Sequence, residues 1–190
     1  MNISELVLQL QIPRIDEVYY PSDDSYLLLD YLDNPEFDIT LKILSEFTKS
    51  ITILDMGCGT GILGFCLAFK IIYSGFFDVV NLNLVDINSK AIEATKFMMN
   101  ENLHFLNHLA GYTRGILTVN YFTSNLFNEI PRMMYDIVVF NPPYLPQDEE
   151  IQNTLPIDQA LYGGPEGISI LQTFFEHLKY YISTRSVVYF

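Results

Sequence analysis

A short apolar strand, a glycine-rich turn and an apolar helix follow one another in this chain, and this unit constrains its fold most. Residues 51–54 are Ile-Thr-Ile-Leu, 55–61 are Asp-Met-Gly-Cys-Gly-Thr-Gly, and 62–72 are almost wholly apolar. Glycines in such a turn permit positive φ and let a ligand approach the backbone. A helix that is apolar all round is covered on most sides. The unit therefore predicts a buried strand, a tight or ligand-binding turn, and a buried helix.

Strand patterns recur after this unit and alternate with helical ones. Further strands are expected at 79–85, 116–122 and 137–140, and a fifth begins at 187–190. Strands separated by helices build parallel sheets with helices on both faces. We therefore expect an α/β fold with a doubly wound, mostly parallel sheet.

Helices are expected before and between these strands. One opens at Ser22, where hydroxyl and carboxylate side chains suit the free N–H groups of a first turn, and runs to about Leu32. Residues 103–114 read as irregular, with His104 and His108 as surface or loop residues. The other helices are expected at 39–49, from a cap at Asn88 onward, and at 168–182.

Length and composition bound the organisation of the chain. Its 190 residues, 49% of them hydrophobic, suit a single domain, with an N-terminal helical segment at 1–50 and a core at 51–190. No run of about 18 apolar residues predicts a membrane span, and residues 1–11 do not read as a secretory signal. Cys58 and Cys66 lack neighbours with metal-ligand spacing. We expect reduced packing cysteines, no metal site and a cytoplasmic location.

The net charge limits the partners of the chain. It is −13, with a pI near 4.4, and no cluster of Lys and Arg interrupts the acidic residues. Solubility alone would explain this charge, but it also repels phosphate backbones and attracts basic proteins. Nucleic acid is therefore not expected as the substrate.

The tetrapeptide Asn-Pro-Pro-Tyr at 141–144 directly follows the strand at 137–140. The strand delivers it to the carboxyl edge of the sheet, where open α/β folds bind ligands. The Asn141 side-chain oxygen and the Pro142 carbonyl are acceptors, and Pro143 keeps Pro142 extended. A planar –NH2 group fits this pair, with Tyr144 as an aromatic wall. The tetrapeptide alone could be a rigid turn, but it favours a site that alkylates an amide or amino nitrogen.

Polar residues also follow the first three strands. Asp55 precedes the glycines and suits a cationic ligand, and the glycine spacing differs from the dinucleotide fingerprint. Asp86 ends the second strand, where an acid accepts hydrogen bonds from ribose hydroxyls, or where it simply opens the next helix. Asn125 and Leu126 follow the third strand and could contact an adenine edge.

With these motifs in this order, the chain resembles class I S-adenosylmethionine-dependent methyltransferases. More narrowly, it resembles the HemK-type protein-glutamine methyltransferases of the archaeal and eukaryotic branch. The resemblance covers roughly residues 17–177 and is most specific at 18–29, 141–144 and 160–167. It implies S-adenosylmethionine as cofactor. It also implies, as substrate, the glutamine of a Gly-Gly-Gln tip on a class 1 translation termination (release) factor.

The resemblance also implies roles for individual residues. Asn141 and Pro142 would hold the target amide and Tyr144 would wall it, so these three form the catalytic set, and the substrate-binding set adds Pro143. Ser25 would lie near the methionine part of the cofactor. The whole set implied for the cofactor is Ser25, Asp55, Gly57, Gly59, Thr60, Gly61, Asp86, Ile87, Asn125 and Leu126.

The chain departs from the family pattern in two places, and the resemblance also implies one partner. Asn125 stands where the family usually has Asp, and an Asn keeps the acceptor oxygen. The chain stops at Phe190, so the C-terminal antiparallel strand pair of the family is expected to be missing. A small zinc-binding activator protein is implied at the edge formed by the third strand, 116–122.

Two other functions remain open at this point. One is methylation of an exocyclic amine on a nucleic-acid base, since the same tetrapeptide serves there. The other is a catalytically silent, cofactor-binding scaffold subunit, because an uncovered strand at 187–190 would offer an edge for association.

Overall fold

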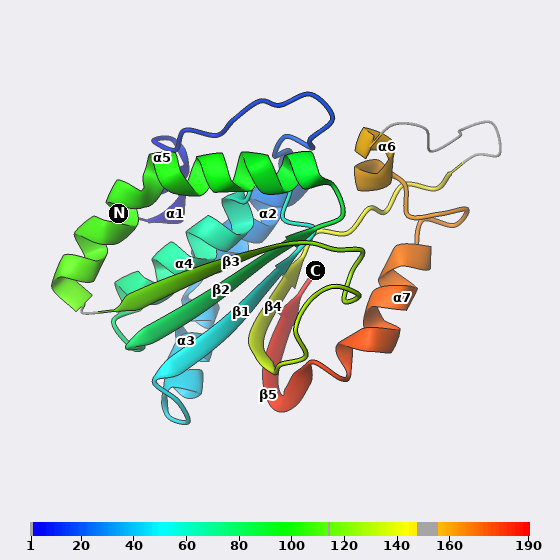
Figure 1. Ribbon diagram of the computed structural model, residues 1–190. Helices are drawn as coiled ribbons and strands as arrows, with labels where there is room; N and C mark the ends of the chain where they lie inside the picture. The colour runs from blue at the N-terminus through cyan, green and yellow to red at the C-terminus, as the bar shows by residue number, and fades with distance from the viewer. Residues whose placement is uncertain (1, 114, 148–155) are drawn as a thin grey trace.

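A five-stranded parallel sheet forms the centre of the computed structural model, which describes residues 2–113, 115–147 and 156–190 (Figure 1). The strand order is β3-β2-β1-β4-β5, and every neighbouring pair runs parallel. This confirms the predicted doubly wound, mostly parallel sheet. The strands are β1 (Ser50–Met56), β2 (Val79–Asp86), β3 (Ile116–Thr123), β4 (Tyr135–Phe140) and β5 (Ile182–Tyr189).

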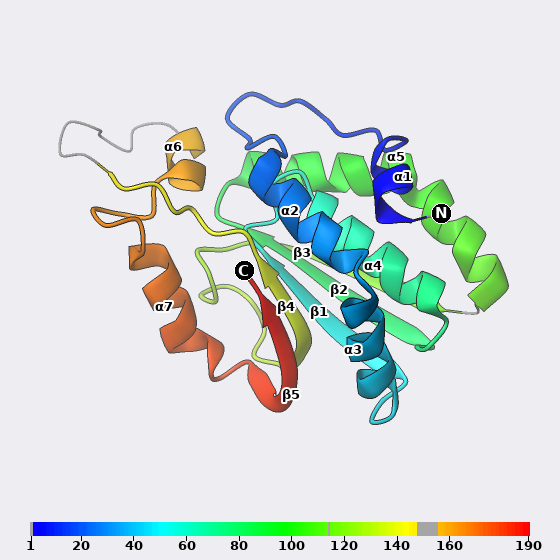
Figure 2. The same cartoon turned by 180° about the vertical axis from the view of Figure 1, so that it is seen from behind.

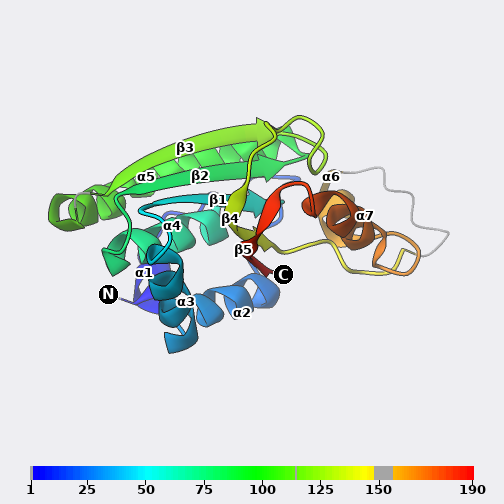
Figure 3. The same cartoon turned by 90° about the horizontal axis from the view of Figure 1, so that it is seen from below.

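Helices cover the two faces of the sheet unequally. Five of them, α1 to α5, lie on one face, where α4 and α5 pack on β1 to β3 and the first three pack on α4 or on each other (Figures 2 and 3). The other face is covered by α7 over β1 and β4. The helices are α1 (Ile3–Val7), α2 (Asp23–Leu32), α3 (Pro35–Ser45), α4 (Ile62–Ser74), α5 (Ser89–Thr113), α6 (Pro156–Leu161) and α7 (Ser169–Leu178).

The central strands are apolar on both sides because helices cover both faces. In β1, Ile53 packs with the α4 side, while the next residue, Leu54, packs with Phe174 of α7. Both β1 residues are fully buried. This double burial explains why residues 51–54 read as a continuous apolar run and not as an alternating one. None of the described helices is long and apolar enough to cross a membrane.

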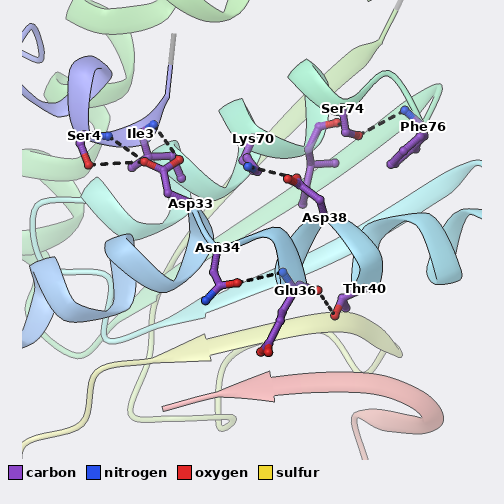
Figure 4. Close-up of polar contacts among 11 residues, drawn as sticks. Ile3, Ser4, Asp33, Asn34, Glu36, Asp38, Thr40, Lys70, Ser74 and Phe76 are labelled. Carbon is purple, nitrogen blue, oxygen red and sulfur yellow. Dashed lines mark hydrogen bonds and ion pairs between the residues drawn. The ribbon is translucent and has the colours of Figure 1, made fainter.

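Polar contacts fix the N-terminal helices against the core (Figure 4). Asp33, at the end of α2, accepts hydrogen bonds from the N–H groups of Ile3 (2.8 Å) and Ser4 (3.1 Å) in α1. Lys70 of α4 forms an ion pair of 3.0 Å with Asp38 of α3. These contacts hold α2 in place, and with it the segment 17–25, which reaches the carboxyl edge of the sheet.

Several predicted helix boundaries were wrong. The helix expected at 39–49 is α3, which begins at Pro35 because Asn34 caps it by accepting the Glu36 N–H (3.0 Å) and because proline suits a first helical position. The helix expected at 168–182 ends at Leu178, and residue 182 already belongs to β5. The short helices α1 and α6 were not predicted.

Residues 103–113 were predicted to be irregular and are instead the second half of α5; Arg114 lies outside the described residues. Asn102 is fully buried and exchanges two hydrogen bonds with the backbone of Gln11 (2.9 and 3.1 Å). The buried Asn102 side chain therefore stabilises α5 just before the residues that were predicted to be irregular. His104 is exposed on α5, as expected for a surface residue.

Candidate active site

A cavity of about 350 Å³ opens at the carboxyl ends of β1 to β4. It lies where the order of the sheet reverses between β1 and β4, the place at which open α/β sheets bind ligands. Segments 17–25 and 159–162 complete its wall. The predicted site residues that line it are Ser25, Gly57, Gly59, Thr60, Asp86, Ile87, Asn125, Leu126, Asn141, Pro142 and Pro143.

The glycine turn between β1 and α4 has a backbone that few other residues adopt. Gly57, Gly59 and Gly61 have φ values of 65°, 56° and 84°, in the left-handed region. Gly61 does not line the cavity, and a Cβ there would lie 2.8 Å from Thr95 Cγ2. Its predicted place beside the cofactor is therefore replaced by a role in closing the turn against α5.

Asp86 joins the glycine turn to the start of α5. Its carboxylate accepts the Gly59 N–H (2.9 Å) and the Asn88 N–H (2.9 Å), and it lines the cavity. Burial raises its pKa, against the lowering effect of these backbone hydrogen bonds. A carboxylate has about four acceptor positions, so Asp86 keeps capacity for hydroxyl groups of a ligand.

Asp55 lies beneath the turn and does not line the cavity. It is fully buried, and its Oδ2 accepts the Gly64 N–H (2.8 Å). No described residue bonds its Oδ1. Burial raises the pKa of Asp55 to about 7, and the nearby charge of Asp86 adds to this effect. The predicted direct contact with the cofactor is therefore not supported by its position.

Asn141 is held by its amide nitrogen. Nδ2 donates to Ser25 Oγ at 3.4 Å, and the Ser25 hydroxyl donates in turn to Asp24 (3.3 Å). Burial alone would raise the pKa of Asp24, but hydrogen bonds from Asn141, Ser25 and Tyr19 outweigh it and hold this pKa below its usual value. An ionised carboxylate only accepts hydrogen bonds. It therefore orients the donor end of the Asn141 amide toward α2, and no described residue occupies the side-chain oxygen.

Tyr144 stands outside the cavity, contrary to its predicted role as a wall. Its ring is 54% exposed, and its hydroxyl donates to Asp24 Oδ2 at 3.4 Å. The negative charge of Asp24 raises the pKa of Tyr144 and keeps the hydroxyl protonated. The aromatic side chain thus ties the end of the tetrapeptide to α2. Tyr162 is the tyrosine from the neighbouring segment that lines the cavity.

The residues after β3 include one with a rare backbone conformation. Leu126 has a φ of 50°, which is rare for a residue with a side chain. The Ser124 hydroxyl donates to the Leu126 carbonyl (2.9 Å) and accepts the Glu129 N–H (2.9 Å), which holds this conformation. Asn125 lines the cavity beside it. Strain of this kind gathers at functional sites.

Sequence reasoning missed part of the wall. Glu17, with a φ of 69°, Val18, Tyr19 and Pro21 also line the cavity. The Asn88 amide donates to the Glu17 carbonyl (2.8 Å), and Lys90 pairs with its carboxylate (2.7 Å). The block at 18–29 signalled this region, but Asp24 and Tyr19 gained their importance only through contacts with residues far along the chain.

The chemistry of the wall fits S-adenosylmethionine. Among the described lining residues the charged side chains are Glu17, Asp24 and Asp86, and none is Lys, Arg or His. An acidic wall suits a ligand with a sulfonium and an ammonium group. Thr60 also lines the cavity, with a buried hydroxyl that no described residue bonds. Cavities of a few hundred Å³ are typical of cofactor sites.

The two cysteines do not form part of this chemistry. Cys58 and Cys66 are free and buried, and burial raises the pKa of both thiols. Cys58 Sγ lies 3.4 Å from Thr95 Oγ1. They act as small packing residues. The described residues contain no group of three or more His, Cys, Asp or Glu side chains that could hold a metal ion.

A parallel sheet in the order 3-2-1-4-5, with a glycine turn and an Asn-Pro-Pro-Tyr segment beside one cavity, defines a class I methyltransferase. Residues 33–157 match the family model described as the methyltransferase small domain, and the chain belongs to this family. The catalytic domain of hMettl16, solved with the MAT2A 3′UTR hairpin 1, has the same fold, with a TM-score of 0.56 at 14% identity. That match covers 91% of this chain and 58% of hMettl16.

Two curated relatives confirm the predicted HemK-type branch. MJ0928 of Methanocaldococcus jannaschii, named for protein N5-glutamine methyltransferase activity, is 31% identical over 172 residues, 90% of this chain and 70% of its own length. The eRF1 methyltransferase catalytic subunit mtq2 of Schizosaccharomyces pombe is 28% identical over 186 residues, 95% of this chain and 74% of its own length.

Proposed function

We propose that this protein transfers a methyl group from S-adenosylmethionine to the side-chain amide nitrogen of a glutamine in a class 1 release factor. The observation that carries the proposal is the hydrogen bond from Asn141 Nδ2 to Ser25, because it leaves the Asn141 side-chain oxygen beside the cavity without a partner among the described residues. The names of MJ0928 and mtq2 support the amide and the release factor as targets. Such a substrate would place the protein in the cytoplasm.

An amide nitrogen is a poor nucleophile because its lone pair is delocalised into the carbonyl. The Asn141 oxygen and the Pro142 carbonyl would accept one N–H each from the target amide and turn its nitrogen out of conjugation. The cofactor supplies an electrophilic methyl group on a sulfonium. Fixed acceptors at the reacting nitrogen would also stabilise the positive charge that develops there, which is preorganisation combined with orientation.

The reaction balances without a general base in the transition state. A nitrogen–carbon bond forms as the sulfur–carbon bond breaks, and S-adenosylhomocysteine leaves. The methylated nitrogen is then strongly acidic and loses one proton to water. The absence of His and Lys from the described cavity wall agrees with this route.

The proposal predicts transfer to one glutamine. Purified release factor, incubated with the protein and labelled cofactor, should gain one methyl group at the glutamine of its Gly-Gly-Gln tip, as read by mass spectrometry of the digested factor. The same factor with that Gln replaced by Ala should gain none. DNA and RNA arms test the alternative substrate, and label in nucleic acid but not in the factor would replace this proposal by base methylation.

An activator subunit is the second part of the proposal. The mtq2 relative is named as a catalytic subunit, which implies a further subunit for that protein. In this chain β3 forms one edge of the sheet; residues 116–119 alternate between exposed and half-buried, and residues 120–122 are half-buried. Ile116, at its start, is 63% exposed. An exposed edge of this kind pairs readily with another strand, so a small zinc-binding partner would add to the sheet here.

Disrupting the β3 edge should separate partner binding from catalysis. Val119→Pro removes an N–H from the edge strand, so co-purification of the zinc-binding partner is expected to fall about tenfold or more. Ile39→Ala, at an exposed residue of α3 on another surface, is the control. Affinity capture and gel filtration measure the effect. Equal partner binding by both variants would rule out this edge.

A further inference from the structure

The loop at residues 161–167, Leu-Tyr-Gly-Gly-Pro-Glu-Gly, lies on the chain that follows β4. The Leu145 N–H donates to the Leu161 carbonyl (2.9 Å), and the Leu145 carbonyl accepts the Gly163 N–H (3.0 Å). The Gln147 N–H donates to the Gly164 carbonyl (2.9 Å). These three hydrogen bonds build a short parallel bridge between two segments that both border the cavity.

Two glycines of the loop touch the backbone of the tetrapeptide. A Cβ on Gly163 would lie 2.5 Å from the Pro143 carbonyl oxygen and would also meet the Gly167 carbonyl oxygen. A Cβ on Gly167, whose φ is 75°, would collide with the Tyr144 carbonyl oxygen. The carbonyls of Pro143 and Tyr144 therefore approach the loop at places where only a hydrogen atom fits.

The loop is itself anchored and cannot retreat freely. The Ser169 N–H, at the start of α7, donates to the Gly163 carbonyl (2.8 Å). Helix α7 is packed on the sheet through Phe174, which is fully buried with its ring centroid 4.7 Å from that of Phe140. Phe140 directly precedes Asn141. The same helix thus supports both the loop and the strand end that carries the tetrapeptide.

We propose that Gly163 and Gly167 are positioning residues for methyl transfer. By holding the Pro143 and Tyr144 carbonyls against the loop, they fix the two peptide planes that directly follow the Pro142 carbonyl, and so limit how far Pro142 and Asn141 can move away from the cavity. The inference rests on the proposed function of those two acceptors. It gives a role to the 160–167 motif beyond its part in the cavity wall.

The size of the effect follows from the geometry. Ordinary carbon–oxygen contact begins at 3.4 Å, so a methyl group at Gly163 must displace the Pro143 carbonyl by about 0.9 Å. A misplacement of about 1 Å at a reacting centre costs about 100-fold in rate. The cofactor contacts of Asp86 and the glycine turn are made by other segments, so cofactor binding should not follow this loss.

The test compares Gly163→Ala with a glycine control outside the loop, Gly75→Ala. Gly163 lacks a positive φ, so its substitution adds steric pressure without backbone strain. Gly75→Ala adds backbone strain (φ 67°) in open space. We expect Gly163→Ala to lower kcat about 100-fold, with the cofactor Kd within about threefold. Gly75→Ala should keep kcat within about threefold while losing thermal stability.

Amide hydrogen exchange gives a readout that does not need activity. In Gly163→Ala the Leu145 and Gln147 N–H groups should exchange at least about tenfold faster, because displacement of the Pro143 carbonyl moves the segment that carries these donors away from their acceptors on the loop. If the wild-type protein methylates no glutamine, the proposed function fails, and exchange alone decides the role of the loop. Unchanged kcat, unchanged exchange, or equal losses of kcat and cofactor affinity would each overturn the positioning role.

Gly167→Asn covers the case in which Gly163→Ala does not fold. Asn tolerates a positive φ better than Ala does, so this variant presses on the Tyr144 carbonyl with less backbone strain. It should reproduce the loss of kcat at unchanged cofactor Kd. If both variants fail to fold while Gly75→Ala folds, the loop serves stability and the positioning role is wrong.

Discussion

Asn141→Ala is expected to lower methyl transfer about 100- to 1,000-fold while cofactor affinity stays within about twofold. The substitution removes one of the two acceptors that would orient the target nitrogen. It also removes the donor that reaches Ser25, so of the two side chains that join the segment after β4 to α2 only Tyr144, which donates to Asp24, remains. Isothermal titration with the cofactor and a turnover assay on the same preparation measure the two effects.

Asp86→Ala is the contrasting variant for this experiment. Its carboxylate accepts the Gly59 and Asn88 N–H groups, so its removal loosens the turn and the start of α5 together. Cofactor affinity should fall about 100-fold before any effect on the bound complex is seen. Asn81→Ala, at a half-buried residue of β2 that does not line the cavity, should change neither quantity. Near-normal turnover by Asn141→Ala would show that Asn141 does not orient the target nitrogen.

Asp55→Asn is expected to stabilise the protein at high pH relative to the wild type. Burial raises the pKa of Asp55 from its usual 3.8 to about 7, so the folded state binds a proton that the unfolded state releases between these values. The wild type therefore loses stability as pH rises through this window, by up to about 4 kcal/mol in total. An amide resembles the protonated carboxyl and keeps the acceptor for the Gly64 N–H.

Urea unfolding at pH 5, 6, 7 and 8 would measure this difference. The free energy of unfolding of Asp55→Asn minus that of the wild type should grow by about 2 kcal/mol between pH 5 and pH 7, and level off above pH 7. Asp136→Asn is the matched control, because that strand carboxylate also accepts one backbone N–H, from Thr52 (2.8 Å), but is only half-buried. Parallel curves for Asp55→Asn and the wild type would show that Asp55 does not carry the effect.

Local patterns predicted the sheet and the strand ends well. Apolar runs at 51–54 and 137–140 became β1 and β4 because both faces of those strands are covered. The glycine turn, Asp86 and Asn141 then reached one cavity, because the carboxyl ends of parallel strands share one edge of the sheet. Helix ends were harder, since the caps at Asn34 and the burial of Asn102 depend on contacts that no local pattern reveals.

The finer arrangement of the site needed the three-dimensional structure. Asp24 meets Asn141 and Tyr144 across more than a hundred residues, and its position in the first turn of α2 suggested only helix capping. Ser22 was expected to cap that helix with its side chain but forms no such bond. From the sequence, both Asp55 and Asp86 were expected to contact the cofactor, Asp55 at its cationic end and Asp86 at the ribose. Only the packing of Gly64 above Asp55 shows that one acid is buried while the other borders the cavity.

The strand order has a consequence for how the protein folds as it is synthesised. β1 lies between β2 and β4, so one side of β1 waits without a neighbour until residues 135–140 have left the ribosome. Pairings between such distant segments form slowly, and an unpaired apolar strand attracts other chains in the meantime. We therefore expect the nascent chain to depend on chaperones most during the interval between the synthesis of β1 and that of β4.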